Sequence, residues 1–183
     1  KLLGPVKWTY FYLYVILDVF SRYVPGWLVA TRESAALADR LIAETIAREG
    51  VGRGTLTLHA DRGSSMTSGD VSRLLATLGV GRSHSRPHVS NDNPYSEALF
   101  RTLKYRPSFP SRPFADIAAA IAWVERFVDW YNPKHLHSAI NFVTPDDRHF
   151  GRHLNILTAR SRVYAAARRL HPERWSGKTR SWE

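Results

Sequence analysis

The stretch SNDNPYSEALFRTLKYRP, residues 90–107, opens with turn-forming residues and continues as an amphipathic helix. Asn93 is a good N-cap residue, and Pro94 fits the first helical position after it. The positions on one side of this helix form a mostly apolar stripe, which consists of Tyr95, Ala98, Leu99, Thr102 and Leu103. Another face carries Glu97, Arg101 and Lys104 at i, i+4 and i+7. The pattern predicts a helix that exposes one carboxylate followed by two cations.

A carboxylate and two cations on a helix can be ordinary solvated decoration, and that interpretation stays open. A possible acidic partner lies upstream, in the segment LHADRG that contains Asp61. Thirty-five residues lie between Asp61 and Glu97. Residues 55–60 read as a short strand that ends just before Asp61, so this carboxylate is expected at the C-terminal end of a strand.

The remaining pattern predicts an α/β fold. Residues 8–19 and 23–31 are expected to form an antiparallel hairpin, with Pro25-Gly26 indicating an edge or a bulge. Further strands are expected at 55–60 and 80–85, and helices at 34–49, 67–78 (capped by Thr67 with Asp70 and stopped by Gly79), from 94 onward, 114–131 (ended by Asn132-Pro133) and 155–170. The order strand, strand, helix, strand, helix, strand, helix indicates a mixed sheet with helices on both faces.

The composition points to a polyanionic partner. Twenty-six Lys and Arg stand against sixteen Asp and Glu, which gives a net charge of +10 and an isoelectric point near 10.3. Nucleic acid is the simplest partner for such a charge, although an acidic protein or a merely solvated basic surface is compatible with it. The absence of cysteine excludes disulfides and thiolate metal sites and fits a reducing cytoplasm. The apolar residues 8–17 are too few to span a bilayer, so no membrane partner is expected.

Three segments give the chain a family resemblance. They are HADRGS at 59–64, SNDNPYSE at 90–97, and Trp130-Tyr131-Asn132 followed by His135, His137, Ser138, Thr144 and Pro145. In this order they resemble the integrase-core transposases of bacterial insertion sequences, which are relatives of retroviral integrases. The resemblance implies a ribonuclease-H-like fold, with residues 1–150 as the catalytic core. Residues 151–183 hold +6 of the charge and have a weak apolar stripe, which predicts a basic helix followed by a flexible tail.

The family's site contains three carboxylates, Asp, Asp and Glu, and the resemblance assigns the last two to Asp61 and Glu97. The first Asp would lie a few residues before the stretch matched by residues 1–3, on a strand truncated here. This chain alone is therefore expected to be inactive. Asp18 is interpreted as a structural strand-end carboxylate, and Asp92 as a turn residue.

The chemistry implied is strand transfer on DNA by two Mg²⁺ (or Mn²⁺) ions, for which carboxylate oxygens are the preferred ligands. Asp61 and Glu97 are the expected catalytic and metal-binding residues. The expected phosphate contacts are Arg62, Arg101, Lys104 and Arg106. The partners would be transposon ends and target DNA, and the protein would act as a homo-oligomer on DNA.

Other polar residues receive structural interpretations. His59, His84 and His88 are expected to be surface or hydrogen-bonded residues and not metal ligands. Tyr131, Asn132, His135 and His137 are expected to fix the turn after the long helix. Two alternatives to a strand-transferase stay open, namely a non-catalytic DNA-binding or assembly remnant of a transposase and a ribonuclease-H-like nuclease that cuts without joining.

Overall fold

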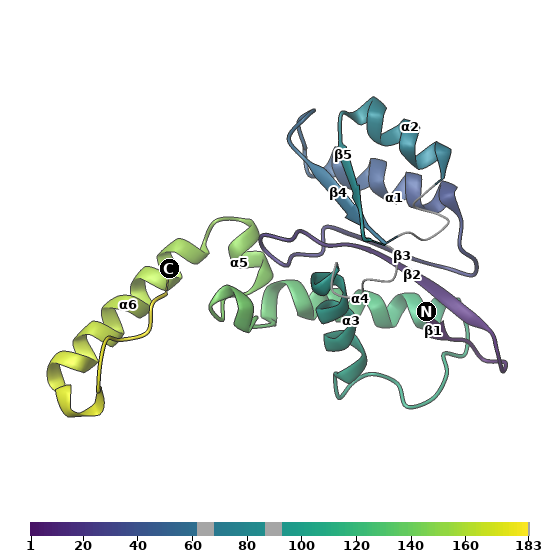
Figure 1. The fold of residues 1–183 in the computed structure, drawn as a ribbon. Coiled ribbons are helices and arrows are strands. Elements are labelled where there is room, and N and C mark those ends of the chain that lie inside the picture. Colours follow the sequence, from purple (N-terminus) through teal and green to yellow (C-terminus); the bar gives the residue numbers. More distant parts are fainter. Residues whose placement is uncertain (62–67, 87–92, 183) are drawn as a thin grey trace. The chain divides into compact units, whose positions relative to one another are not determined.

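The computed structural model describes residues 1–61, 68–86 and 93–182, and these form a mixed α/β structure (Figure 1). The chain divides into two compact units. The first contains Lys1–Asp18 and Val24–Phe127, and the second contains Val19–Tyr23 and Val128–Glu183. The predicted domain boundary after residue 150 stays a prediction.

The described strands of the first unit form an antiparallel set and a parallel pair. The antiparallel set runs in the order β1 (Leu2–Leu3), β2 (Tyr10–Ile16) and β3 (Gly26–Ala30). It contains the predicted hairpin and leaves β3 at its edge, as Pro25-Gly26 indicated. The parallel pair consists of β4 (Thr57–Ala60) and β5 (Gly81–His84), joined through helix α2 (Gly69–Leu78).

One hydrophobic core connects both sets of strands with α1 (Ala35–Arg48) and α2. Its buried residues are Ala38 and Ile42 from α1, Val71 and Leu75 from α2, and Val80. Tyr14 and Ile16 of β2 and Leu58 of β4 pack against this cluster. The two sets of strands therefore cover the same helices, although their described residues form separate sheets.

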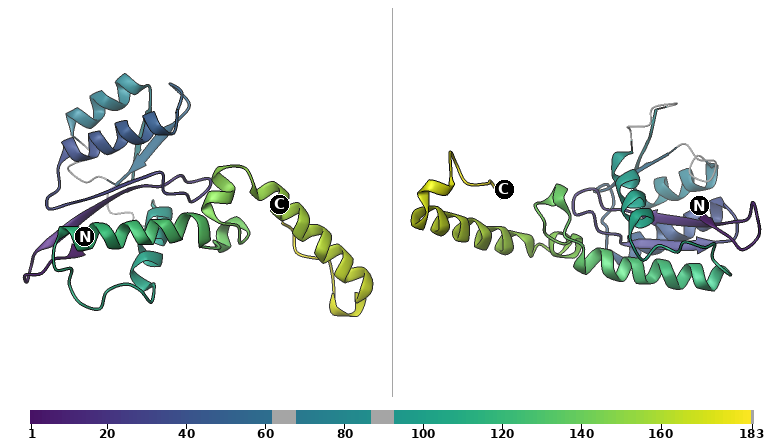
Figure 2. Two further views of the ribbon diagram at one scale, coloured as in Figure 1. Left: turned by 180° about the vertical axis from the view of Figure 1, so that it is seen from behind. Right: turned by 90° about the horizontal axis from the view of Figure 1, so that it is seen from below.

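A second apolar layer lies on the other side of the antiparallel strands, where Figures 1 and 2 show α3 (Pro94–Tyr105) and the start of α4 (Ile117–Lys134). Leu99 and Leu103 of α3 are buried. Trp123 of α4 contacts the rings of Phe114 and Phe127, with centroids 6.2 and 5.7 Å away. The backbone N–H of Phe114 donates to the carbonyl of Leu3 at 3.0 Å.

The helix ends follow the sequence signals with two corrections. Gly79 ends α2 in the left-handed conformation (φ 66°) that a residue without Cβ adopts readily. The N-cap of α2 is Ser68, which accepts from the N–H of Val71 at 3.3 Å, so the predicted cap at Thr67 is one residue too early. Helix α4 continues to Lys134, past the predicted stop at Asn132-Pro133, because a proline near a helix end removes little hydrogen bonding.

The second unit contains the short helices η2 (Ser138–Ile140) and α5 (Pro145–His149), the long α6 (His153–Leu170) and η3 (Pro172–Arg174). Its core consists of Ile140, Val143, Leu157 and Trp182. The guanidinium groups of Arg160 and Arg180 lie over the indole of Trp182, 5.4 and 4.7 Å from its centroid. The predicted flexible tail is therefore wrong at its end, where Trp182 is 7% exposed.

Across the ranges described, no helix combines the length and apolar character that crossing a bilayer requires.

Candidate functional site

Asp61 follows β4 directly, as predicted, and its side chain is exposed. The register of the parallel pair aligns Ala60 with His84, so the next residues, Asp61 and Ser85, leave the two strands together. The N–H of Ser85 donates to the carbonyl of Ala60 at 3.2 Å and extends the pairing by one step. The C-terminal ends of parallel strands are a common location for functional side chains.

Two neutral side chains donate to the same oxygen of Asp61. The Ser85 hydroxyl donates to Oδ1 at 3.0 Å, and the Nδ2 amide of Asn93 donates to Oδ1 at 3.2 Å. Ser85 is buried and Asn93 is half-buried. Asp61 is thus connected to β5 and to the first residue of the α3 segment.

The Asn93 bond brings the beginning of the Glu97 helix to Asp61. Asn93 occupies the N-cap position and Pro94 the first turn, as the sequence predicts, but the Asn93 side chain does not cap the helix. The N–H of Glu97 donates to the carbonyl of Asn93 at 3.3 Å. Glu97 is therefore one turn, about 6 Å along the helix axis, from the residue that holds Asp61.

The exposed and buried faces of α3 match the sequence pattern. Leu99 and Leu103 are buried, whereas Glu97, Arg101 and Lys104 are exposed. Arg106 follows the helix and donates through Nε to the Ser108 hydroxyl at 2.7 Å, so it is part of the next turn. The predicted contacts of these cations with DNA stay predictions. Arg62, Asp92 and His88 lie outside the described residues.

Ser83 and Ser85, which the sequence did not single out, complete the surroundings of Asp61 together with His59. His59 Nδ1 lies 2.6 Å from Ser83 Oγ, and His59 Nε2 lies 3.3 Å from Ser85 Oγ. A signal for them existed, because residues two apart in a strand point to the same side, which groups His59 with Asp61 and Ser83 with Ser85. The interpretation of His59 and His84 as hydrogen-bonded residues is confirmed, since His84 Nδ1 lies 3.3 Å from the carbonyl of Ala60.

Carboxylate oxygens at a strand end and on a helix surface suit a hard divalent cation. Among residues 1–61, 68–86 and 93–182, no three His, Asp or Glu side chains are arranged to hold a metal ion. The donors that the described structure offers are Asp61, held by neutral partners, and Glu97 on the adjoining helix. The chemistry of these donors fits Mg²⁺ or Mn²⁺, with further ligands to come from elsewhere.

Two family profiles, each described as an integrase core domain, match residues 2–90 and 78–145, and together they cover the strands, Asp61 and the Glu97 helix. The chain belongs to the integrase core family. The predicted resemblance is confirmed.

Relatives and solved structures agree with this family. The transposase for insertion sequence element IS904 of Lactococcus lactis is 31% identical over 144 residues, which are 78% of this chain and 56% of that protein. The chain spans about half the length of the curated relatives that it matches.

The catalytic core domain of BIV integrase aligns with a TM-score of 0.55 at 22% identity, covering 79% of this chain and 89% of that one. The simian T-cell lymphotropic virus intasome, solved with the PP2A regulatory subunit B56 gamma, aligns with a TM-score of 0.60 at 20% identity, covering 80% and 51%. These likenesses confirm the predicted ribonuclease-H-like fold class.

The third segment of the family resemblance, which begins at Trp130, lies in the second unit of this integrase core. Tyr131 and Asn132 are buried, and His135 stacks on the Tyr131 ring at 5.3 Å. The N–H of Ala139 donates to His137 Nδ1 at 3.2 Å. These contacts confirm that the segment fixes the turn after α4.

Burial shifts the pKa values of two side chains of this segment from their ordinary values. It raises the pKa of Tyr131 to about 12, despite the opposing charge of Arg22. It lowers the pKa of His137 to about 4, with the charges of His135 and Arg22 adding to the effect. Both side chains are therefore neutral near pH 7, as expected for packing residues.

The turn between β2 and β3 belongs to the same unit of the integrase core. Ser21 is fully buried, and its hydroxyl lies 3.3 Å from His149 Nδ1. Tyr23 stacks on the His149 ring with centroids 4.3 Å apart, and the Arg148 guanidinium lies over Phe20 at 4.4 Å. The side chains of this turn therefore pack against α5.

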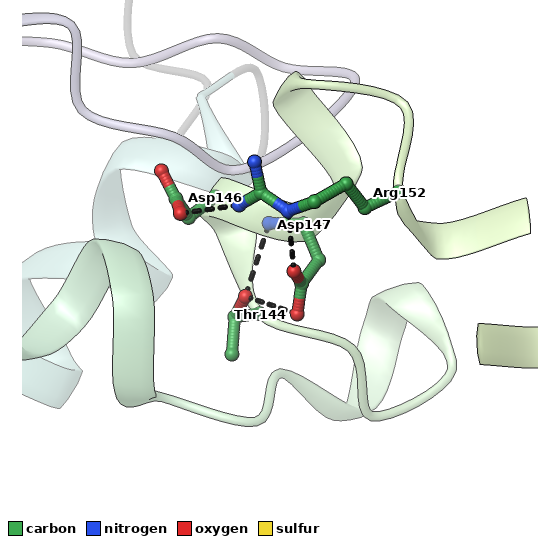
Figure 3. A network of polar contacts seen from close by, with 4 residues as sticks. All are labelled: Thr144, Asp146, Asp147 and Arg152. Atoms are coloured by element: carbon green, nitrogen blue, oxygen red, sulfur yellow. Dashed lines mark hydrogen bonds and ion pairs between the residues drawn. The ribbon is translucent and has the colours of Figure 1, made fainter. Parts of the chain in front are cut away.

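Two acidic residues of α5, Asp146 and Asp147, take part in a network of hydrogen bonds and ion pairs (Figure 3). Thr144 caps the helix by accepting from the N–H of Asp147 at 3.0 Å, and its hydroxyl donates to Asp147 Oδ2 at 2.8 Å. Arg152 donates to Asp147 Oδ1 at 2.9 Å and to Asp146 Oδ2 at 2.5 Å. Burial acts to raise the pKa of Asp147, but the bonds from Thr144 and Arg152 and the charge of Arg152 leave it lowered.

Proposed function

We propose that this chain is the catalytic core of a DNA transposase that carries out metal-dependent phosphoryl transfer, namely end cleavage and strand transfer. The observation that carries the proposal is the hydrogen bond from Asn93 to Asp61, which connects the strand-end carboxylate to the helix that bears Glu97. The relative in Lactococcus lactis is named as a transposase for an insertion sequence, which supports the same reaction class. The protein would act in the cytoplasm, where bacterial DNA is accessible.

Asp61 and Glu97 would hold the Mg²⁺ or Mn²⁺ ions, two in number. When bound, such ions activate the attacking oxygen and stabilise the leaving oxygen of a phosphodiester. The residues of this chain contribute by fixing ligand positions, since Asp61 ends a paired strand and Glu97 lies on a helix anchored by buried Leu99 and Leu103.

The cations of α3 would hold the DNA backbone beside the two carboxylates. Arg101 and Lys104 are exposed, one and two turns beyond Glu97 on the same helix. Arg62 and Arg106 are the further candidates, Arg106 with part of its capacity already directed to Ser108. Such contacts position a duplex and carry little sequence information.

A third carboxylate would come from the sequence that the resemblance places before Lys1. We propose that residues 1–183 alone have little strand-transfer activity and that the upstream sequence restores it.

The active form would be a homo-oligomer that holds transposon ends and target DNA together. The related intasome supports this arrangement, because strand transfer joins two DNA molecules in one complex.

The test compares strand transfer with Mg²⁺ or Mn²⁺ by residues 1–183 and by a chain extended upstream through the preceding Asp. Asp61→Asn and Glu97→Gln in the extended chain should abolish joining. Their matched controls, Asp70→Asn and Glu125→Gln, alter exposed acids of α2 and α4 and should leave joining intact.

Undiminished joining by Asp61→Asn would overturn the proposal. Cleavage without joining would indicate the nuclease alternative, and DNA binding with neither reaction would indicate the non-catalytic remnant.

A further inference from the structure

A line of polar side chains runs across the parallel strand pair and ends on Asp61. It begins at Ser83 on β5, crosses to His59 on β4, returns to Ser85 after β5 and reaches Asp61 after β4. The register pairs His59 with Ser83, so these residues lie side by side on neighbouring strands. Asp61 and Ser85 come two residues later, where the same side of the strands is presented again.

The number of protons that these side chains can donate determines which partner is the donor in each hydrogen bond. A carboxylate only accepts hydrogen bonds, so the single hydroxyl proton of Ser85 is used on Asp61 Oδ1. Ser85 Oγ can then only accept from His59, and His59 Nε2 must carry the proton. In a neutral imidazole Nδ1 is then the acceptor, and the Ser83 hydroxyl donates to it over 2.6 Å.

The donors to Asp61 in the described part of the chain are neutral and act on one of its oxygens. Ser85 and Asn93 both donate to Oδ1, and within the described ranges no hydrogen bond to Oδ2 is present. Neutral donors orient a carboxylate without cancelling its charge, whereas a cationic partner would compete with a metal ion. Oδ2 therefore keeps its charge and lone pairs available to a divalent cation.

We infer that Ser85 is a positioning residue for the metal-binding Asp61, and that His59 and Ser83 fix the direction of its hydrogen bond. The inference rests on the proposed function and deepens it, because it adds residues that the three-carboxylate description does not contain. Burial of Ser85 makes the arrangement specific, since a buried hydroxyl keeps its partners more strictly than an exposed one.

The first experiment measures Mn²⁺ affinity by calorimetry for the full chain and its variants. Ser85→Ala should weaken binding about 10- to 100-fold, the usual effect of losing a partner of a ligand. Ser85→Thr keeps the hydroxyl and should restore affinity to near the original value. Ser72→Ala, which removes a hydroxyl of α2, is the matched control and should change nothing. Thermal unfolding of each variant identifies any loss of folding.

The second experiment needs no metal. Nitrogen-15 and proton spectra of the metal-free chain at pH 8 should give His59 as the Nε2–H tautomer with a slowly exchanging Nε2 proton. Ser85→Ala removes the acceptor and should make that proton exchange rapidly. Ser83→Ala should make the Nε2–H tautomer of His59 less dominant. It should lower Mn²⁺ affinity less than Ser85→Ala does.

The outcomes separate the two proposals. Loss of Mn²⁺ binding in Asp61→Asn together with full binding in folded Ser85→Ala would overturn the positioning role and leave the proposed function standing. Unchanged binding in Asp61→Asn would overturn both. A proton on His59 Nδ1 would reverse the inferred direction and refute the positioning arrangement.

Discussion

Asp61, at the end of β4, accepts hydrogen bonds from the neutral side chains of Ser85 and Asn93, whereas Asp147, in α5, is bonded by Thr144 and by the cationic Arg152. Both carboxylates are held in place, but among residues 1–61, 68–86 and 93–182 a cationic partner is present at Asp147 and not at Asp61. An arginine partner gives a charge-assisted bond and lowers the carboxylate's pKa, which stabilises the fold and reduces the group's attraction for other cations.

The difference would allow one chain to use carboxylates for two different tasks. Acidic residues paired with arginine act as structure, as Asp146 and Asp147 do around Arg152 (Figure 3). A carboxylate held by neutral donors keeps its orientation and its charge. The partner type would therefore distinguish the proposed metal-binding carboxylate, Asp61, from a structural one.

The largest expected effect comes from neutralising each carboxylate in turn. Asp61→Asn should lower Mn²⁺-dependent strand transfer of the upstream-extended chain by more than about 100-fold, since even partners of metal ligands contribute 10- to 100-fold. Asp147→Asn should leave that rate unchanged and should lower the unfolding temperature. Equal losses of activity in both variants would remove the distinction between the two carboxylates.

The next expected effect concerns the stability of the unit that contains Asp147, measured by substituting Trp182. Trp182→Ala removes a buried indole from the cluster of Ile140, Val143 and Leu157 and should cost about 2–3 kcal/mol of unfolding free energy. This is less than for a typical buried Trp, because among the described residues its Nε1 has no hydrogen-bond partner. Leu170→Ala, at a position 75% exposed, is the control and should change stability by less than about 0.5 kcal/mol. An equally small effect at Trp182 would restore the interpretation of a flexible tail.

Asn93→Arg breaks the comparison directly, because it gives Asp61 the kind of partner that Asp147 has. The added cation should lower Mn²⁺ affinity about 10-fold or more through repulsion and competition for the carboxylate. The neutral Asn93→Gln controls for the change in shape and should have a smaller effect. Mn²⁺ affinity in Asn93→Arg equal to that of the original chain would contradict the role assigned to neutral donors.

The local part of this architecture was predictable from the sequence. Asn93-Pro94 marks the start of α3, Gly79 marks the end of α2, and Asp61 lies at the end of its strand, because these signals depend on neighbouring residues only. The side chain of Asn93 was expected to cap its own helix. It bonds instead to Asp61, 32 residues earlier, and such a choice depends on tertiary contacts.

Long-range pairing also explains what was missed. The line from Ser83 through His59 to Ser85 exists only in the register that pairs His59 with Ser83, and strand composition does not specify a register. Trp182 lies in a segment without periodicity, so its burial against Leu157 had no local signal.

The last expected effect is a pH dependence of stability in the second unit. The N–H of Ala139 donates to His137 Nδ1, which only a neutral ring can accept, and burial, aided by the charges of His135 and Arg22, lowers the pKa of His137 to about 4. In the unfolded chain the same ring titrates near 6.5. Between these values the unfolded chain binds a proton that the folded chain does not, so unfolding becomes easier as the pH falls. The contribution of His137 is complete above pH 6.5 and is lost as the pH falls through 4.

Urea unfolding of the full chain at pH 7, 6, 5 and 4 measures this contribution. The unfolding free energy of His137→Gln should decline less between pH 6.5 and 4 than that of the original chain, because glutamine does not titrate. Ser138→Ala, a change at an exposed neighbour, should keep the original slope. Parallel declines in all three proteins would mean that His137 binds protons alike in the folded and unfolded chains, and would contradict the prediction.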